Sequence, residues 1–269
     1  MINIMYASNQ NGFKGILLSV LSILENTKEV ITIHLLSMDA TDIKQSYKMV
    51  SQKNINQLER ILKSYNESNE IILYDLREIH EKYLGAIIDS SYTPYAYLRL
   101  LANKVLKKDK VIYLDIDTMV CGDIKQLYDI DISNYEIAAV NDAAGTFWIK
   151  RNYFNSGVLL INFTRCNATQ VFEKCLELIK NHNYFFVDQT PLNKLIQKRL
   201  KLNRKFNEQR NVRSDTVIKH FCQRMKYFPF PRVWNIKQWD IENVHKKLKI
   251  HKFDGIYQIY DRIKDSFEE

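Results

Sequence analysis

At residues 110–117 the chain reads Lys110-Val111-Ile112-Tyr113-Leu114-Asp115-Ile116-Asp117, an apolar run that ends at two aspartates. Such a run is typical of a strand buried on both faces, as in the centre of a parallel sheet. In open α/β sheets, ligands bind outside the carboxyl ends of these strands. Residues i and i+2 of an extended segment point the same way, so Asp115 and Asp117 present two carboxylates together. The stretch therefore predicts a site for a divalent cation that keeps open positions for the phosphates of a substrate.

The same tripeptide has a simpler interpretation. Aspartate is common in the turns that follow strands, so Asp115 and Asp117 could serve the turn alone. Spacing does not decide between the two interpretations, and the decision depends on the rest of the chain.

The composition is that of a globular protein. The chain has 269 residues, of which 46% are hydrophobic and 26% charged, enough for one large domain or two small ones. No run approaches the roughly 18 apolar residues of a membrane span, and residues 1–6 lack the basic and apolar regions of a secretion signal. The four cysteines show no Cys-x-x-Cys spacing, which fits free thiols in a reducing cytosol. We therefore expect a cytoplasmic protein.

The net charge of +8 comes from basic residues that gather late in the chain, around residues 198–205 and 246–252. A basic face can bind nucleic acid, an anionic membrane surface or a phosphorylated substrate, or it can simply be solvated. No zinc-finger spacing, KH loop or RNP pattern accompanies these residues, so we expect no nucleic-acid partner. A peripheral contact with the inner face of a membrane stays open.

Strand and helix signals alternate along the first half of the chain. Repeated βαβ units of this kind predict an α/β fold, with a mostly parallel, right-handed, doubly wound sheet flanked by helices. We expect strands at 2–7, 30–36, 71–76 and 111–115, and helices at 13–24, 42–65 and 96–106.

The pattern changes after Asp117. Two strands follow at 136–140 and 157–163, then helices at about 168–181 and 188–198, and the last 65 residues read as irregular, aromatic and basic. The chain shows no internal repeat and no Gly/Pro-rich linker. One compact domain with a C-terminal extension is the simplest organisation.

Four ordered motifs together resemble glycosyltransferase family 8, which includes glycogenin and bacterial lipopolysaccharide galactosyl- and glucosyltransferases. They are Lys110–Asp117, Asn152–Asn162 (Asn-Tyr-Phe-Asn-Ser-Gly-Val-Leu-Leu-Ile-Asn), Asp188-Gln189 and His220-Phe221-Cys222. The resemblance implies a GT-A transferase domain over residues 1–226, followed by an extension over 227–269 that packs on the same domain. It also implies retaining, Mn²⁺-dependent transfer of a hexose from a UDP-sugar.

The resemblance assigns the metal to Asp115, Asp117 and His220. Two carboxylates with one imidazole favour Mn²⁺ over Mg²⁺, the alternative ion, because imidazole is a poor ligand for the hardest cations. Without the resemblance, His220 would read as a surface or core histidine.

The remaining carried-over positions would bind the donor. Arg99, in Tyr97-Leu98-Arg99-Leu100, would hold the phosphate and sugar with its fork of N–H donors, although it could equally be an exposed helix arginine. Asp188 and Gln189 would lie beneath the anomeric carbon as the catalytic pair, and Asp188 could alternatively cap the helix that contains Pro191. The other implied donor contacts are Ala7, Asn9, Ile116, Asp142, Asn155 and Lys226.

Two departures from the family pattern affect the donor site. The first loop, residues 7–11, carries amides where family members often have a carboxylate for uridine. Gln223 stands where the family has a glycine, and Tyr227 follows Lys226 in place of Lys-Pro-Trp. The missing glycine bears on how closely the backbone can approach a diphosphate, and so on the role of Lys226.

Retention of configuration can proceed by double displacement or by a front-face path. Gln189 occupies the place of a nucleophile, and its neutral amide is a feeble one. We favour the front-face path, in which the departing phosphate takes the proton of the acceptor and Asp188 and Gln189 stabilise the oxocarbenium character.

The donor sugar and the acceptor are not fixed by the residues. UDP-glucose and UDP-galactose are the expected donors, and a glycan or lipid-linked saccharide is the expected acceptor. The aromatic segment 229–234, Trp239 and the basic segment 246–252 are predicted to hold this acceptor near a membrane, although Phe230 and Trp234 could belong to the core.

Three other functions remain open. A self-glucosylating, glycogenin-like protein is compatible with the 16 tyrosines, and a mass measurement after incubation with UDP-glucose would detect it. A non-catalytic sugar-nucleotide or glycan-binding module would lack UDP-sugar hydrolysis. A nucleic-acid-binding protein would show a steep salt-dependent affinity.

Overall fold

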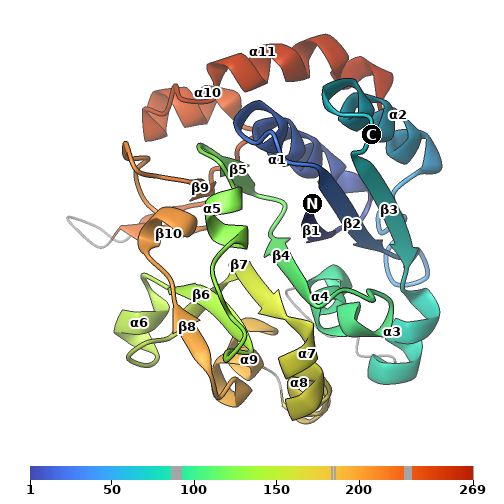
Figure 1. Cartoon of the computed structure of the whole chain (residues 1–269), viewed down its shortest axis with the longest axis vertical. Coiled ribbons are helices and arrows are strands. Elements are labelled where there is room, and N and C mark those ends of the chain that lie inside the picture. The colour runs from blue at the N-terminus through green and yellow to red at the C-terminus, as the bar shows by residue number, and fades with distance from the viewer. Residues whose placement is uncertain (86–92, 183, 185, 227–231, 269) are drawn as a thin grey trace.

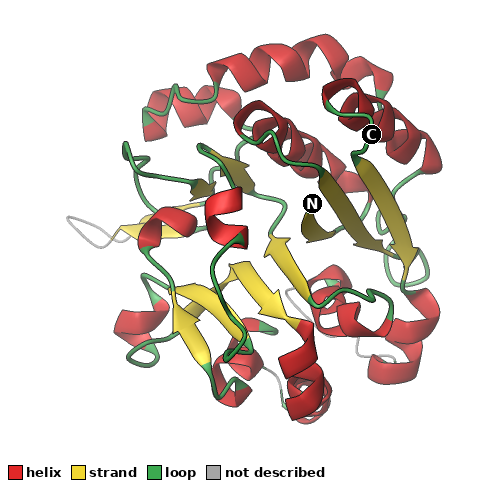
Figure 2. Cartoon of the chain, viewed as in Figure 1, coloured by secondary structure: helices red, strands yellow, loops and turns green. Residues whose placement is uncertain are grey.

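The computed structural model describes residues 1–85, 93–182, 184, 186–226 and 232–268. A seven-stranded sheet divides the molecule, with helices on both faces (Figures 1 and 2). The strands, in spatial order, are β3 (Glu70–Asp75), β2 (Ile31–Ser37), β1 (Ile2–Ala7), β4 (Lys110–Leu114), β7 (Phe154–Asn162), β6 (Ile137–Asn141) and β8 (Arg199–Lys201).

The sheet is mostly parallel, as predicted, with one reversed strand. β7 pairs antiparallel with both β4 and β6, whereas the other neighbouring strands pair in parallel. β7 is thus the one exception within the mostly parallel order that the sequence predicted. Its reversal turns Asn155, Ser156 and Gly157 toward the carboxyl ends of β4 and β6.

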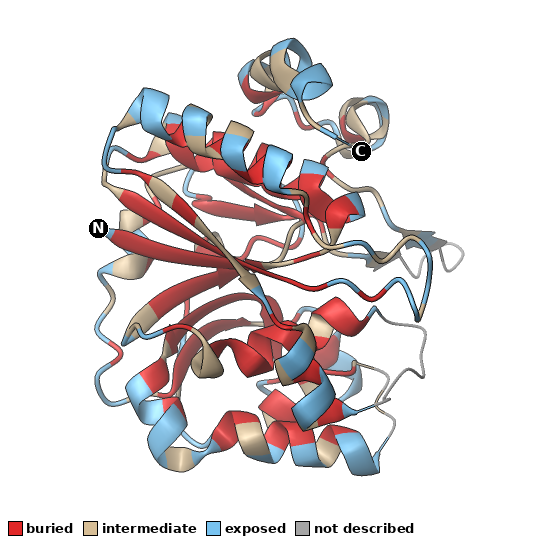
Figure 3. Ribbon diagram, turned by 90° about the vertical axis from the view of Figure 1, so that its right-hand side faces the viewer, coloured by how far each residue is buried: buried red, intermediate tan, exposed pale blue. Residues whose placement is uncertain are grey.

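Alternate residues of the central strands pack into two separate cores. Ile112 and Leu114 of β4 belong to the core on one face, and Val111 and Tyr113 to the core on the other. All four side chains are buried, as predicted for this run. The interior strands are buried along most of their length in Figure 3.

The helices mostly follow the predicted segments. Their bounds are α1 (Phe13–Asn26), α2 (Gln52–Tyr65), α3 (Arg77–Leu84), α4 (Leu98–Leu101), α5 (Lys125–Tyr128), α6 (Gly145–Trp148), α7 (Phe163–Thr169), α8 (Val171–Asn181), α9 (Gln189–Leu195), α10 (Ile241–Asn243) and α11 (Asp254–Ile263).

Three predicted helices differ in the structure. The helix predicted over 42–65 begins only at Gln52, because Ser51 is its cap and accepts the N–H of Asn54 at 3.2 Å. The helix predicted over 96–106 is divided into α4 and short 3₁₀ turns on either side. The helix predicted over 168–181 breaks at Gln170, which adopts a left-handed φ of 54° between α7 and α8.

Two small sheets complete the fold beside the carboxyl end of β4. β5 (Thr118–Val120) pairs antiparallel with β9 (Ile218–His220), and the register places Thr118 opposite His220. β10 (Arg224–Lys226) pairs with β11 (Arg232–Trp234). Because β5 directly follows Asp117, its pairing with β9 brings His220 to the two aspartates.

The described part of the C-terminal segment packs on the same body, and the expectation that it is irregular is wrong. Helix α11 lies over α1 (Figure 1), where Ile256 and Tyr257 are buried. The backbone of Glu268 exchanges hydrogen bonds of 2.8 and 2.9 Å with the Asn54 side chain. The spacing of Phe253, Ile256 and Tyr257 is helical, a signal that the sequence contained. Among the described residues, no helix is long and apolar enough to cross a bilayer.

Candidate functional site

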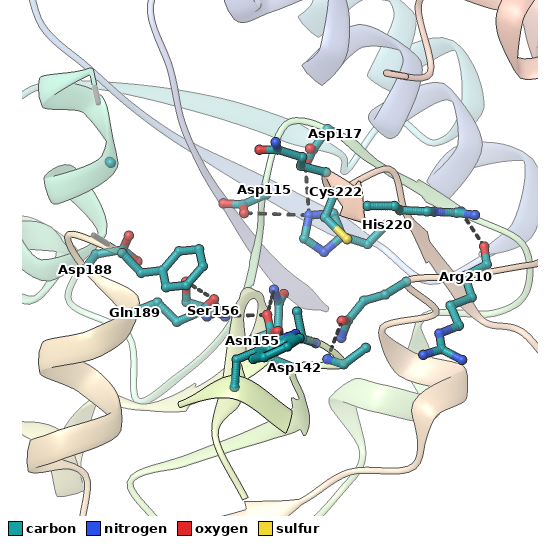
Figure 4. Close-up of a pocket in the computed structure, with 18 of the residues that line it drawn as sticks. Asp115, Asp117, Asp142, Asn155, Ser156, Asp188, Gln189, Arg210, His220 and Cys222 are labelled. Carbon is teal, nitrogen blue, oxygen red and sulfur yellow. Dashed lines mark hydrogen bonds and ion pairs between the residues drawn. The ribbon is translucent and has the colours of Figure 1, made fainter. Parts of the chain in front are cut away.

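A cavity of about 860 Å³ opens at the carboxyl end of β4, where an α/β sheet is expected to bind its ligand. Figure 4 shows side chains from separate parts of the chain converging on it, among them Asp115, Asp142 and His220. Most of the predicted site residues line this cavity, namely Arg99, Asp115, Asp117, Asp142, Asn155, Asp188, Gln189 and His220.

The three predicted metal ligands form one cluster. The Nε2 atom of His220 lies 3.0 Å from Oδ1 of Asp117 and 3.8 Å from Oδ2 of Asp115. One ligand atom from each residue lies within 4.8 Å of the others. Asp117 and His220 are buried, whereas Asp115 is partly open to the cavity.

A chain of buried amides sets the orientation of His220. Asp142 accepts a hydrogen bond from Nδ2 of Asn155 at 2.9 Å, so Oδ1 of Asn155 is left to accept from Nδ2 of Asn207 at 2.9 Å. The Oδ1 atom of Asn207 then accepts from Nδ1 of His220 at 3.1 Å. Because Nδ1 carries the proton, Nε2 is the ring nitrogen that faces the carboxylates, as a metal-ligating histidine requires.

The donor set fits a divalent cation. Two carboxylate oxygens and an imidazole nitrogen are lone-pair groups, and at these separations they repel unless a cation or a proton lies among them. Gly157 keeps the space beside the cluster free, since a Cβ atom there would lie 2.2 Å from Cε1 of His220 and 2.6 Å from Oδ2 of Asp115.

Lys237 is the strongest addition to the site that the sequence interpretation missed. Its ammonium lies 2.5 Å from Oδ2 of Asp117, and both residues line the cavity. Burial by itself would raise the pKa of Asp117, but the adjoining His220 imidazole and Lys237 ammonium outweigh it and hold that pKa well below its usual range. Asp117 is therefore ionised and able to act as a ligand.

Gln238 and Trp239 fasten the segment after Lys237 to the metal loop. Nε2 of Gln238 donates to the carbonyl of Ile116 at 2.6 Å. Trp239 packs so tightly on Gly15 that a Cβ atom there would lie 2.7 Å from its ring. The sequence signal was the Lys-x-Trp of residues 237–239, which is similar to the Lys-Pro-Trp sought near Lys226. The backbone of Lys226 lies in β10, and its side chain lies outside the described residues, as does Phe230.

Arg99 is buried, so its interpretation as an exposed helix arginine is wrong. Nη2 donates to Oδ1 of Asp115 at 2.8 Å, and Nη1 donates to the carbonyl of Ser156 at 2.7 Å. Burial would lower the pKa of Arg99, but the carboxylates of Asp115 and Asp188 outweigh it and raise that pKa. Arg99 is thus a permanent cation that also positions Asp115.

Asp188 and Gln189 lie side by side at the start of α9. The side chain of Asp188 makes no capping bond, and its Oδ2 lies 3.4 Å from Nε of Arg99. Burial raises the pKa of Asp188, an effect that Arg99 offsets only in part. Oε1 of Gln189 accepts the N–H of Ser156 at 2.9 Å, and its Nε2 lies 3.4 Å from Oδ2 of Asp142.

The first loop lies beside the metal loop because β1 and β4 are neighbours. A Cβ atom on Gly12 would lie 2.8 Å from Cδ1 of Ile116. Oδ1 of Asn9 accepts the N–H of Gly12 at 3.1 Å and so caps a short 3₁₀ turn. Ala7, Asn9 and Ile116 are not among the residues that line the cavity, and their contact with a nucleoside stays a prediction.

The chain is similar in sequence to known glycosyltransferases over most of its length. The profile described as glycosyl transferase family 8 matches residues 3–227. The lipopolysaccharide 1,3-galactosyltransferase of Salmonella typhimurium is 28% identical, over 80% of this chain and 67% of that enzyme. Glycosyltransferase GlyB of Streptococcus pneumoniae is 35% identical over 64% of this chain, which spans only 46% of GlyB.

The structure is also similar to solved ones. The galactosyltransferase LgtC, in complex with donor and acceptor sugar analogs, superposes with a TM-score of 0.71 at 16% identity, covering 99% of this chain and 100% of LgtC. The GlyE structure from Streptococcus pneumoniae gives 0.66 at 19% identity, covering all of this chain and 64% of GlyE. The likeness to LgtC confirms the predicted GT-A fold.

Proposed function

Because the chain belongs to glycosyltransferase family 8, we propose that it transfers a hexose from UDP-glucose or UDP-galactose, with retention of configuration, to a glycan or lipid-linked saccharide. The observation that carries this proposal is the cluster of Asp115, Asp117 and His220 on the wall of a cavity that also holds Asp188 and Gln189. A charge-bearing cluster next to a buried carboxylate and amide suits a donor whose phosphate and sugar ends need different environments.

Asp115, Asp117 and His220 would hold the divalent ion, and we propose Mn²⁺. Such an ion, when bound, grips a diphosphate and neutralises the charge that develops as UDP departs. The ammonium of Lys237, which lies against Oδ2 of Asp117, would stabilise the same developing negative charge. Lys237 thereby takes the role first sought at Lys226.

The contacts of Gln189 support the front-face path. Its Oε1 already accepts the N–H of Ser156, and its Nε2 faces Asp142. An amide oxygen held in this way is a poor nucleophile, so the acceptor attacks on the face that UDP leaves and the departing phosphate takes its proton. Asp188, held in place by Arg99, supplies negative charge to stabilise the oxocarbenium character of the sugar.

The test combines a screen of UDP-sugars with one pair of variants. Purified protein is incubated with each UDP-sugar, with and without Mn²⁺, and released UDP is measured. We expect metal-dependent hydrolysis of UDP-glucose or UDP-galactose and its loss in Asp117→Ala. Asp131→Ala is the matched control, because Asp131 is an exposed aspartate that accepts the N–H of Ser133 and does not line the cavity. Wild-type turnover by Asp117→Ala at saturating Mn²⁺ would refute the metal site.

The setting of the enzyme also remains a proposal. We place it in the cytoplasm, peripheral to the membrane that carries a lipid-linked acceptor, on the basis of the basic residues at 246–252.

A further inference from the structure

Three consecutive large apolar side chains are exposed at the rim of the cavity. Phe147 is 78% exposed, Trp148 62% and Ile149 49%. Phe147 and Trp148 also line the cavity, together with Asp142. In the described part of the chain, the other exposed large apolar residues stand singly. They are Met1, Tyr65 and Val233. An exposed aromatic cluster at the mouth of a site is a signature of a ligand surface.

The base of this cluster is firmly held, although its tip is in solvent. Oδ1 of Asp142 accepts the N–H groups of Ala144 at 3.0 Å and Gly145 at 2.6 Å. Gly145 packs directly on Tyr153, where a Cβ atom would lie 2.3 Å from the ring. Oε1 of Gln209 accepts the N–H of Ala143 at 3.0 Å. Helix α6 therefore presents Phe147 and Trp148 in a fixed position.

Asp142 joins the aromatic rim to the inner site. Its Oδ1 holds α6, and its Oδ2 accepts from Asn155 and faces Gln189. A group seated on Phe147 and Trp148 would thus lie next to the sugar end of a bound donor, on the side open to solvent. This is where an acceptor has to enter.

The cavity lining also includes polar side chains that reach solvent. Arg210, Asn211 and Gln223 are exposed, and Arg224 is partly exposed. A pyranose ring matches both kinds of surface, because its C–H face packs on an aromatic ring while its hydroxyl groups need hydrogen-bond partners. An acyl chain would bury these polar groups without partners.

We propose that Phe147 and Trp148 form the acceptor subsite, where a pyranose ring of the acceptor stacks before transfer. This inference rests on the proposed transferase function and names the class of acceptor, a saccharide that presents its terminal ring. It moves the acceptor contact from the C-terminal aromatic segment to α6.

The test measures transfer relative to hydrolysis. Phe147→Ala, Trp148→Gln and the double variant are compared with Ile149→Ala, an exposed apolar neighbour outside the cavity lining. Methyl β-galactoside, methyl β-glucoside and lactose serve as acceptors, with the donor selected in the hydrolysis screen. We expect the ratio of transfer to hydrolysis to fall about tenfold for each single aromatic variant and to stay at the wild-type value for Ile149→Ala. Thermal unfolding midpoints verify that all four variants are folded.

Saccharide binding is also read directly from tryptophan fluorescence. We expect an accepted saccharide to change the emission of the wild-type protein and to leave that of Trp148→Gln unaltered. The proposed subsite is refuted if none of the saccharides is accepted and none changes the tryptophan emission. It is also refuted if the aromatic variants keep the wild-type ratio of transfer to hydrolysis. It is also overturned if the double variant loses only binding to vesicles of phosphatidylcholine and phosphatidylglycerol, which would make α6 a membrane contact beside Lys150 and Arg151. Absence of any UDP-sugar hydrolysis by the wild type would instead refute the proposed function itself.

Discussion

Replacing Asn207 by alanine should weaken metal binding although Asn207 touches no metal. Asn207 is 1% exposed, and its Oδ1 is the acceptor for Nδ1 of His220 at 3.1 Å. Without that acceptor the imidazole can rotate or carry its proton on Nε2, the atom that faces Asp115 and Asp117. Loss of such a supporting hydrogen bond typically lowers metal affinity about 10- to 100-fold, which corresponds to about 1.4–2.7 kcal/mol.

Mn²⁺ affinity is measured by isothermal titration calorimetry, with and without UDP. Asn69→Ala is the matched control, because Asn69 is also a buried asparagine with two hydrogen bonds. Its side chain accepts the N–H of Ile31 at 2.9 Å and donates to the carbonyl of Leu62 at 3.0 Å, and none of these residues lines the cavity. Both variants should lose stability, by about 1–3 kcal/mol for the unpaired buried groups. Only Asn207→Ala should lose metal affinity.

A second substitution separates the two bonds that Asn207 makes. Asn207→Asp keeps an oxygen for Nδ1 of His220 but removes the donor to Oδ1 of Asn155. It should therefore bind Mn²⁺ more tightly than Asn207→Ala does. If Asn207→Ala bound Mn²⁺ as tightly as the wild type, the account of how His220 is oriented would be wrong.

Three further predictions address the same cavity. Gly157→Ala should fold but bind Mn²⁺ about 100-fold more weakly, because the added Cβ atom would lie 2.2 Å from the His220 ring. Calorimetric titration measures this affinity, and an unchanged value would contradict the packing of Gly157 against His220. Lys237→Met should raise the Kd for UDP by about 10-fold, the typical loss of one charge-assisted contact. Lys246→Met is the control, because it removes an exposed lysine paired with Glu242, and it should leave the Kd for UDP unchanged. Equal Kd values for the two variants would exclude Lys237 from the diphosphate site. Asp188→Asn should lower hydrolysis by about 100-fold without loss of stability at neutral pH, because burial raises the pKa of this carboxyl above its ordinary 3.8. A carboxyl with a raised folded-state pKa stabilises the wild type below pH 3.8, and this stability is lost as pH rises through the folded-state pKa. The asparagine variant has no such carboxyl, so its stability relative to the wild type should increase from acid to neutral pH, as measured by urea unfolding at both. A variant less stable than the wild type at neutral pH would contradict this reasoning.

The sequence by itself determined the central strand and the class of fold. The run from Val111 to Leu114 alternates between two apolar faces whatever its neighbours are, because side chains of a strand point to opposite sides. Asp115 and Asp117 follow from the same local rule. The motifs at Asp188-Gln189 and His220 were also visible, because each lies in a short stretch with a family pattern.

Only the tertiary structure decided which distant groups complete the site. Lys237 reaches Asp117 because β9 and the segment after β11 bring it there, and no local pattern encodes that distance in space. The role of Asn207 depends on a series of buried amides in which each orientation is set by the next, from Asp142 through Asn155 to His220. Hydrogen-bond direction and the reversal of β7 are properties of the assembled chain, since non-local pairings are chosen by the whole packing rather than by the residues on either side.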